Sequence, residues 1–248
     1  MLLNKKEGVG TDMRLDKFFS ECGILSRRDS ARAVSRGEIT VNGTPVRRAD
    51  VKVDEEKDEI LFRGERVKYS RFVYIMLNKP TGYISATEDG NLPVVTSLLP
   101  EDIQRRGVFP CGRLDRDTVG FMLITDDGEL SHLLLSPKRH VAKKYAFTLS
   151  LPLSIGAEER FLSGITLGDE VCKSALLTLN AERTAGEIVL TEGKYHQIKR
   201  MMVKEGSEVV SLERLSFAEI PLDESLARGE WRHLTDREIA QLKSAVSK

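Results

Sequence analysis

Apolar residues near the start of the chain recur with the period of a helix. Leu15, Phe18 and Phe19 fall at i, i+3 and i+4, which is the apolar stripe of a short amphipathic helix. Ser26 is a good N-cap for a second helix that runs to about Ser35. The pattern therefore predicts two short helices, one directly after the other.

A β-hairpin is expected next. Ile39–Val41 and Pro45–Val46 flank Asn42-Gly43, and this pair adopts the positive φ angles that a tight two-residue turn requires. Further short strands are expected around Val51, Val53, Ile60 and Phe62. Residues 13–69 are thus predicted to form a small α+β module.

After a short polar link, the pattern of the remaining chain becomes richer in strands. Strands are expected at Phe72–Leu77, Phe121–Ile124, Tyr145–Leu151, Ala175–Leu179, Ile188–Thr191 and Val209–Phe217. Helices are expected at Gly128–Leu135, Ala157–Leu162, His196–Lys204 and Asp236–Val246. Residues 72–248 are therefore predicted to form an α+β domain with a largely antiparallel mixed sheet and flanking helices. Residues 1–12 show neither period and are expected to be a flexible extension.

Composition places the chain among ordinary globular proteins. It has 248 residues, of which 40% are hydrophobic and 31% charged. No apolar run approaches the roughly 18 residues of a membrane-spanning helix, and no secretion signal is visible, so a cytoplasmic protein without membrane contact is expected. The three cysteines and four histidines are scattered, so neither a disulfide framework nor a metal site is predicted.

The charge is unevenly distributed although the net charge is zero. Residues 14–48 carry eight basic and four acidic side chains, whereas residues 50–65 carry seven acidic and three basic ones. Arg28, Arg32 and Arg36 are spaced i, i+4 and i+8, so they project from one face of the second helix. Such a face is either simply solvated or placed to contact the phosphates of a nucleic acid.

The sequence around Asp115 has the composition of a rigid polar loop. Gly112 and Gly120 bracket an arginine and two aspartates, and an apolar strand follows immediately. An Asp-rich surface turn is the simple interpretation. The alternative is a catalytic carboxylate that is held in place by the loop.

Two sets of segments resemble known families. RLDKFF, the Ser-capped basic helix and ITVNGTPV together resemble the RNA-binding module named after ribosomal protein S-four. GRLDRDTVG resembles the signature loop of pseudouridine synthases. Three further segments occur in the order of that family, namely LNKPTGY at 77–83, KY at 144–145 and EGKYHQIKRM at 192–201. The chain after residue 12 is accordingly identified as a member of the RsuA-type group.

This resemblance implies an enzyme that isomerises uridine to pseudouridine without a cofactor. It assigns Asp115 as the catalytic aspartate, Tyr145 as the residue against the target base, and Lys199 as the cation that pairs with Asp115. Lys199 stands where the family usually has arginine. The expected RNA contacts are Arg113, Arg28, Arg32, Arg36, Lys79, Lys143 and Arg200.

The expected partner is ribosomal RNA of the small subunit (16S), because YHQIKRM resembles the version of the late motif found in enzymes for that subunit. A large-subunit enzyme and a non-catalytic assembly factor that binds ribosomal RNA remain as alternatives. A hydrolase using Asp115 and Asp117 is disfavoured, since two carboxylates in one short loop need not flank a sugar ring. A monomer is expected.

Overall fold

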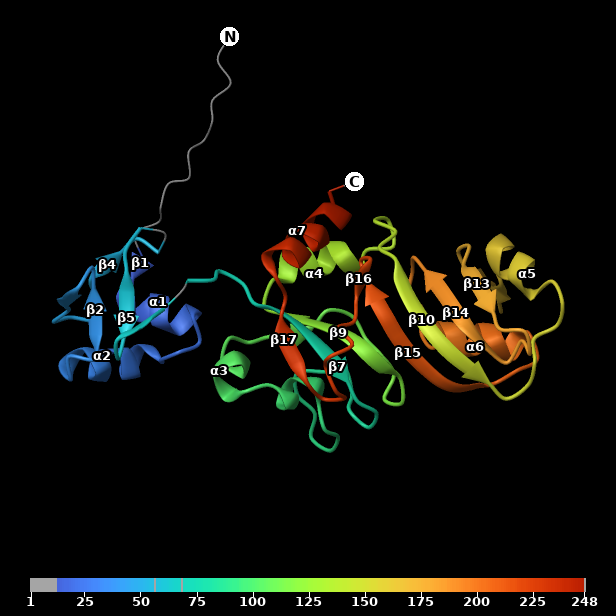
Figure 1. Cartoon of the computed structure of the whole chain (residues 1–248), viewed down its shortest axis with the longest axis horizontal. Coiled ribbons are helices and arrows are strands. Elements are labelled where there is room, and N and C mark those ends of the chain that lie inside the picture. Colours follow the sequence, from blue (N-terminus) through green and yellow to red (C-terminus); the bar gives the residue numbers. More distant parts are fainter. Residues whose placement is uncertain (1–12, 56, 68, 248) are drawn as a thin grey trace, which may run out of the picture. The chain divides into compact units, whose positions relative to one another are not determined.

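The computed structural model describes residues 13–55, 57–67 and 69–247 and divides the chain into two compact units (Figure 1). The first unit contains the chain up to Phe72, and the second contains Val73–Leu99 and Val108–Lys248. One segment departs from the expected boundaries, because Pro100–Gly107 groups with the first unit. Its Arg106 guanidinium donates to the backbone carbonyls of Ser70 and Arg71, each at 3.1 Å. The expected extension at residues 1–12 lies outside the described residues.

The first unit is a small α+β module. Its helices are α1 (Leu15–Glu21), α2 (Arg27–Ser35) and the short α3 (Glu101–Gln104). Its strands are β1 (Met13–Arg14), β2 (Ile39–Val41), β3 (Thr44–Pro45), β4 (Lys52–Val53), β5 (Ile60–Phe62) and β6 (Glu65–Arg66). They form a four-stranded antiparallel sheet in the order β3-β2-β5-β6 and a two-stranded β1-β4 pair.

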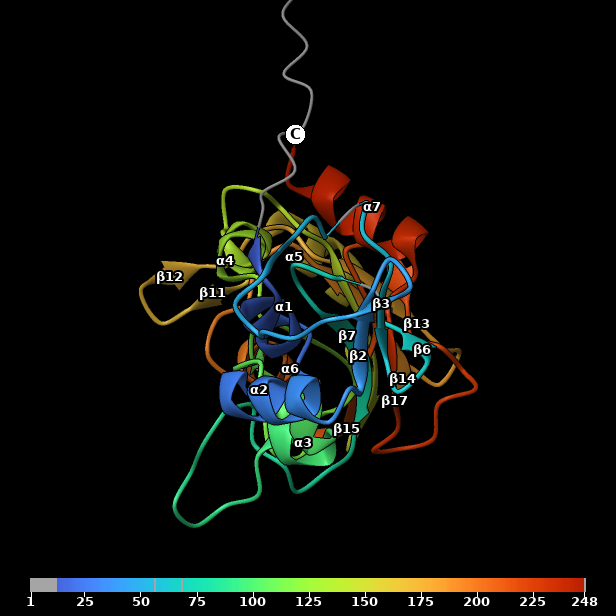
Figure 2. The same cartoon turned by 90° about the vertical axis from the view of Figure 1, so that its left-hand side faces the viewer.

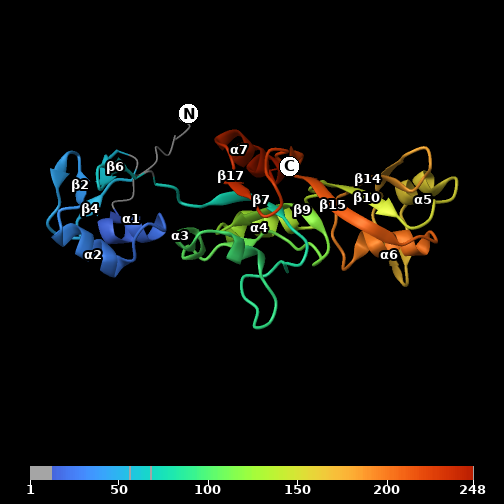
Figure 3. The same ribbon diagram turned by 60° about the horizontal axis from the view of Figure 1, so that its bottom comes forward.

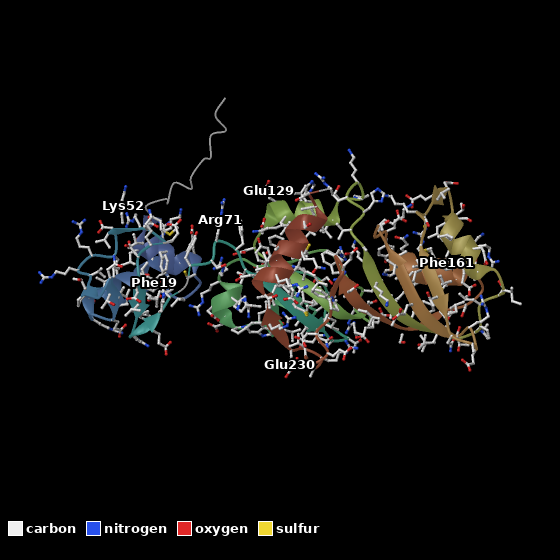
Figure 4. All side chains as sticks on the ribbon, turned by 45° about the horizontal axis from the view of Figure 1, so that its top comes forward. Phe19, Lys52, Arg71, Glu129, Phe161 and Glu230 are labelled. Carbon is white, nitrogen blue, oxygen red and sulfur yellow. The ribbon has the colours of Figure 1, made fainter. Side chains whose placement is uncertain are left out.

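The local signals in this unit act as the sequence predicts. Phe18 and Phe19 are buried in its core, where Phe19 is labelled in Figure 4. The Ser26 hydroxyl accepts a hydrogen bond from the backbone of Asp29 and caps α2. Asn42 adopts a positive φ of 50° in the turn between β2 and β3. The first unit is therefore held by a small apolar core and well-formed caps and turns.

The second unit is built on one nine-stranded sheet, which confirms the expected mixed, largely antiparallel architecture. The main strand order is β13-β14-β10-β15-β9-β7-β17, with β16 paired to β15 and β8 paired to β9. Of the strand pairs described, β15 with β9 is parallel and the others in this sheet are antiparallel. The bounds are β7 (Tyr74–Lys79), β8 (Phe109–Pro110), β9 (Val119–Thr125), β10 (Lys143–Leu149), β13 (Leu176–Leu179), β14 (Ala185–Leu190), β15 (Val209–Phe217), β16 (Ile220–Pro221) and β17 (Trp231–His233).

Helices and a separate hairpin complete this unit. They are the 3₁₀ helix η1 (Val95–Leu98), α4 (Gly128–Leu135), α5 (Ala157–Ser163), α6 (Gln197–Lys204), α7 (Asp236–Ala245) and the hairpin of β11 (Thr166–Leu167) and β12 (Glu170–Val171). The hairpin stands out from the sheet in Figure 2. Helix α5, with its buried Phe161, packs beside β13 (Figure 4), and α6 packs on β15 and β11 (Figure 3). The described part of the chain contains no helix long and apolar enough to cross a membrane.

The second residue of β9, Gly120, has no room for a side chain. Its φ is +98°, and a Cβ built there would lie 2.4 Å from the carbonyl oxygen of Arg214 on β15. Any side chain would therefore push β9 away from β15. The glycine allows this close approach and so places the end of the Asp115 loop against the centre of the sheet.

Candidate active site

A buried lysine, Lys79, holds the loop that contains Asp115 through hydrogen bonds to its backbone. Lys79 ends β7, where it pairs with Gly120, and its side chain is fully buried. Its Nζ lies 2.8–3.3 Å from four backbone carbonyl oxygens, those of Pro80, Asp115, Arg116 and Thr118. An ammonium can donate three hydrogen bonds, so this single cation fixes the backbone on both sides of Asp115.

A second set of hydrogen bonds ties the same loop to the segment that follows β7. The backbone N–H of Gly82 donates to the carbonyl of Arg116 at 2.9 Å, and the Arg116 Nε donates back to the Gly82 carbonyl at 3.1 Å. The Ser85 hydroxyl both donates to the Leu114 carbonyl and accepts from its N–H, at 2.8 and 2.9 Å. The KPTG segment is thus a support for the loop that carries Asp115.

Two side chains from one later segment reach the Asp115 carboxylate. His196 Nε2 lies 3.2 Å from Oδ1, and Lys199 Nζ lies 3.5 Å from Oδ2. Lys199 makes shorter contacts with Asp117, at 2.6 and 2.7 Å to its two carboxylate oxygens. The Lys199 ammonium lowers the pKa of the Asp117 carboxyl below its usual range. One cation is therefore shared by two carboxylates, and Asp117 holds it more closely.

Helix α6 aims Lys199 and His196 at the loop. The buried Gln197 donates from Nε2 to Glu192 at 2.6 Å and accepts from the backbone N–H of Lys194 at 2.9 Å, which fixes the turn before the helix. His196 caps the helix in the left-handed conformation, with φ 48° and ψ 35°. A non-glycine residue there costs of order 1 kcal/mol, and it persists only where its surroundings hold it.

Tyr145 approaches the same region from the sheet. It lies on β10 opposite Arg214 of β15, and Arg214 in turn lies opposite Gly120 of β9. Two strand spacings, about 10 Å, therefore separate Tyr145 from the end of the Asp115 loop. The β10–β15 register shifts between Lys144 and Tyr145, because β15 carries one extra residue there, Leu215. Tyr145 is 8% exposed, so its side chain is buried.

Two further cations are buried beneath this region. Arg214 is 2% exposed and donates from Nε to the Phe121 carbonyl at 2.6 Å. Lys143 is 7% exposed, donates to the Val141 carbonyl at 3.0 Å and lies 5.7 Å from the centre of the Phe217 ring. Burial is the main reason that the pKa values of Lys79 and Lys143 are both lowered to about 8, and the nearby Arg214 charge acts in the same direction. The floor of the site is therefore rich in positive charge.

The comparisons with known proteins agree with this geometry. Residues 73–204 match the RNA pseudouridylate synthase family, and residues 13–60 match the S4 domain. The chain belongs to the RNA pseudouridylate synthase family. This confirms the resemblance that the sequence motifs indicated and the identity of the first unit as an S4 domain.

Individual relatives of this pseudouridylate synthase cover nearly its whole length. It is 40% identical over 231 residues to an uncharacterized RNA pseudouridine synthase of Bacillus subtilis (strain 168), which covers 92% of this chain and 97% of that protein. It is 38% identical over 232 residues to the ribosomal small subunit pseudouridine synthase A of Escherichia coli (strain K12), which covers 93% and 100%. A crystal structure of a pseudouridylate synthase superposes with a TM-score of 0.65 and 36% identity, over 93% of this chain and 99% of that one.

The structure corrects two of the RNA contacts predicted from sequence. Lys79 is fully enclosed and uses its ammonium on backbone carbonyls, so it supports the loop that contains Asp115 instead of meeting a phosphate. Lys143 alternates along β10 with Tyr145 and points the same way into the interior. The other predicted RNA contacts are exposed, as RNA binding requires: Arg28, Arg32, Arg36, Arg113 and Arg200.

Sequence reasoning missed His196 and Arg214. The four histidines were regarded as scattered and His196 was given no role within the EGKYHQIKRM motif, yet it contacts Asp115 across 81 positions of sequence. Its place in the first turn before α6, three residues ahead of Lys199, was the available signal. Arg214 lies within an otherwise alternating strand, and only the tertiary structure reveals that it is buried. Among the residues that the structure describes, no group of His, Cys, Asp and Glu side chains is placed to hold a metal ion.

Proposed function

We propose that this protein isomerises a uridine to pseudouridine in small-subunit ribosomal RNA, with Asp115 as the catalytic carboxylate. The observation that carries the proposal is the Asp115 carboxylate itself, which lies within 3.2–3.5 Å of His196 and Lys199 in a loop fastened by Lys79. The relatives named ribosomal small subunit pseudouridine synthase A support the choice of RNA.

The reaction fits the residues at hand. The N1–C1′ glycosidic bond breaks, the uracil rotates, and a C5–C1′ bond forms. C5 loses a proton and N1 gains one, so atoms and electrons balance without an external oxidant or reductant. Asp115 serves as the nucleophile or the base during cleavage of the glycosidic bond, and both roles require its ionised form.

Tyr145 and the exposed arginines take the remaining roles. The target base must leave its stack to reach Asp115, and we propose that it then lies against Tyr145 of β10. Arg113 is exposed two residues before Asp115, and we propose that it holds the flipped nucleotide. The arginines on the outer face of α2 supply phosphate contacts from the S4 domain.

Tritium release from RNA labelled at uracil C5 tests the proposal. The wild-type protein is incubated in parallel with small-subunit RNA, large-subunit RNA and partly assembled subunits of each. Release from the small-subunit substrates alone is expected. Release from the large-subunit substrates would transfer the reaction to that RNA. Absence of release from all of them, with RNA binding retained, would make the chain a non-catalytic binding protein.

A further inference from the structure

Tyr195 is an exposed aromatic residue at the entrance to the site. Its side chain is 76% exposed, although it lies directly before α6 and one residue from the His196 that contacts Asp115. The Tyr195 and His196 rings stack, with centroids 3.9 Å apart and planes inclined by 16°. The tyrosine ring is therefore supported on its neighbour while most of its surface remains open to solvent.

His196 fixes this stack relative to the catalytic loop. Its backbone is left-handed and its Nε2 lies 3.2 Å from Asp115. The imidazole is thus attached at one edge to the carboxylate and covered on its face by Tyr195. A ligand that rests on Tyr195 lies one ring away from the group that contacts Asp115.

A groove of about 380 Å³ begins at the same histidine. It runs between the residues of the β11 turn and the outer face of α6, where His196, Lys199, Arg200 and Lys204 line it. Arg200 and Lys204 are both exposed. On the hairpin side the Glu170 carboxylate is paired with Lys194 at 3.3 Å. The groove consequently presents cations next to an exposed aromatic ring.

We propose that the Tyr195–His196 stack and this groove bind the nucleotide next to the target uridine, in single-stranded RNA. The base stacks on Tyr195, and Arg200 and Lys204 contact the neighbouring phosphates. An aromatic ring beside a basic track is how proteins bind unpaired nucleotides, because every base has a π face and every nucleotide a phosphate. This inference rests on the proposed function, since it concerns the strand that carries the reacting uridine.

Tyr195→Ala, Tyr195→Leu and Tyr195→Phe test the stack. Tritium release from labelled small-subunit RNA gives KM and kcat. Affinity for the same RNA is measured in an Asp115→Asn background. Alanine and leucine should each raise KM and Kd about tenfold, while kcat changes less than threefold. Phenylalanine should restore wild-type values, because it keeps the aromatic face. Leu176→Ala, which changes an apolar residue on β13 that is 60% exposed, is the matched control and should change nothing.

Several outcomes would overturn the inference. Unchanged KM and Kd in Tyr195→Ala would show that no RNA base stacks on Tyr195. Full affinity in Tyr195→Leu would replace stacking by simple apolar contact, and a defect in Tyr195→Phe would assign the role to the hydroxyl. A fall in kcat alone would make Tyr195 a support for His196. The proposed function fails separately, through absence of tritium release by the wild type, and the binding arm still reports on the stack in that case.

Discussion

Two sets of cations in this chain have opposite surroundings. The arginines of α2 stand on an exposed helix face, whose opposite side buries Ala33 and Val34 in the core of the S4 domain. Lys79, Lys143 and Arg214 of the second unit are buried, and their donors meet backbone carbonyls. The first set is open to solvent and can contact phosphate, although Arg32 also pairs with Asp29 at 3.0 Å. The second set is enclosed and cannot.

The difference shows that a basic residue in a motif of an RNA enzyme is not thereby a ligand for RNA. Desolvating an ammonium is costly, and it is tolerated at Lys79 because four carbonyl dipoles surround the charge. What this arrangement provides is a fixed backbone for Asp115. Exposed cations would then determine affinity, and buried ones would determine the reaction rate.

Replacement of the Asp115 carboxylate should separate reaction rate from RNA affinity most strongly. Asp115→Asn keeps the size of the side chain but removes its negative charge, so tritium release should fall by at least about 1000-fold. RNA affinity should stay within about threefold of wild type, because the α2 arginines are untouched. Filter binding and tritium release on the same RNA measure both. Equal loss of both would contradict the assignment of Asp115.

Removal of the buried lysine should come next in size. Lys79→Met retains the bulk but loses the donors to the loop, so Asp115 shifts and kcat should fall about 100-fold. KM for RNA should change little, since the side chain is enclosed. Lys243→Met on the exposed face of α7 is the control and should leave kcat unaltered. A raised KM with normal kcat would restore the interpretation of Lys79 as an RNA contact.

Removal of the exposed arginines should weaken RNA binding and leave kcat nearly unchanged, the reverse of the effect expected at Lys79. The triple change of Arg28, Arg32 and Arg36 to alanine should raise Kd about tenfold at physiological salt and leave kcat at saturating RNA nearly unchanged. The slope of log Kd against log salt should decrease by about 2, as expected for three lost phosphate contacts to single-stranded RNA.

The matched control replaces three other cations of the same domain, namely Lys52, Lys57 and Arg63, by alanine. These residues lie in the acidic part of the domain, and Lys57 and Arg63 are paired with carboxylates. The control should retain the wild-type salt slope. Identical slopes in both triple variants would mean that α2 does not meet phosphate.

The smallest effect concerns stability. The pKa of Lys143 is about 8 in the folded protein and 10.5 as its ordinary value, so the unfolded chain binds more protons between these two pH values. Titration of Lys143 therefore makes the free energy of unfolding of the wild type rise with pH between about 8 and 10.5. Lys143→Met has no titrating group there and should not show this rise. Between pH 7.5 and 9.5 the free energy of unfolding of the wild type should rise relative to the variant by about 2 kcal/mol. Urea unfolding at both pH values measures the difference, and a constant gap would show that Lys143 is not buried as a cation.

Much of the fold followed from local patterns. The apolar stripe of α1, the Ser26 cap of α2 and the Asn42-Gly43 turn depend on neighbours in sequence, and these elements form where they were predicted. Strand β17 and the β11–β12 hairpin were missed, because two or three residues carry no usable period. The grouping of Pro100–Gly107 with the S4 domain depends on contacts between distant segments, which a single sequence does not encode locally.

The candidate site was predictable in its members but not in its geometry. Motif order indicated Asp115, Tyr145 and Lys199, but gave no means of telling that Lys199 lies closer to Asp117 than to Asp115. The alternation along β10 did contain the information that Lys143 faces the same way as Tyr145. The same period that predicts a buried tyrosine thus predicts a buried lysine two residues earlier.

The 82 positions between Lys199 and Asp117 have a consequence for how the protein matures during synthesis. Domains fold in order as the chain emerges, so the S4 domain is complete long before α6 exists. A nascent chain that ends before α6 can present its α2 arginines but lacks the Lys199 ammonium that contacts the Asp115 carboxylate. Its capacity to modify RNA therefore arises late, after its capacity to hold RNA, and chains that stop early would occupy substrate without converting it.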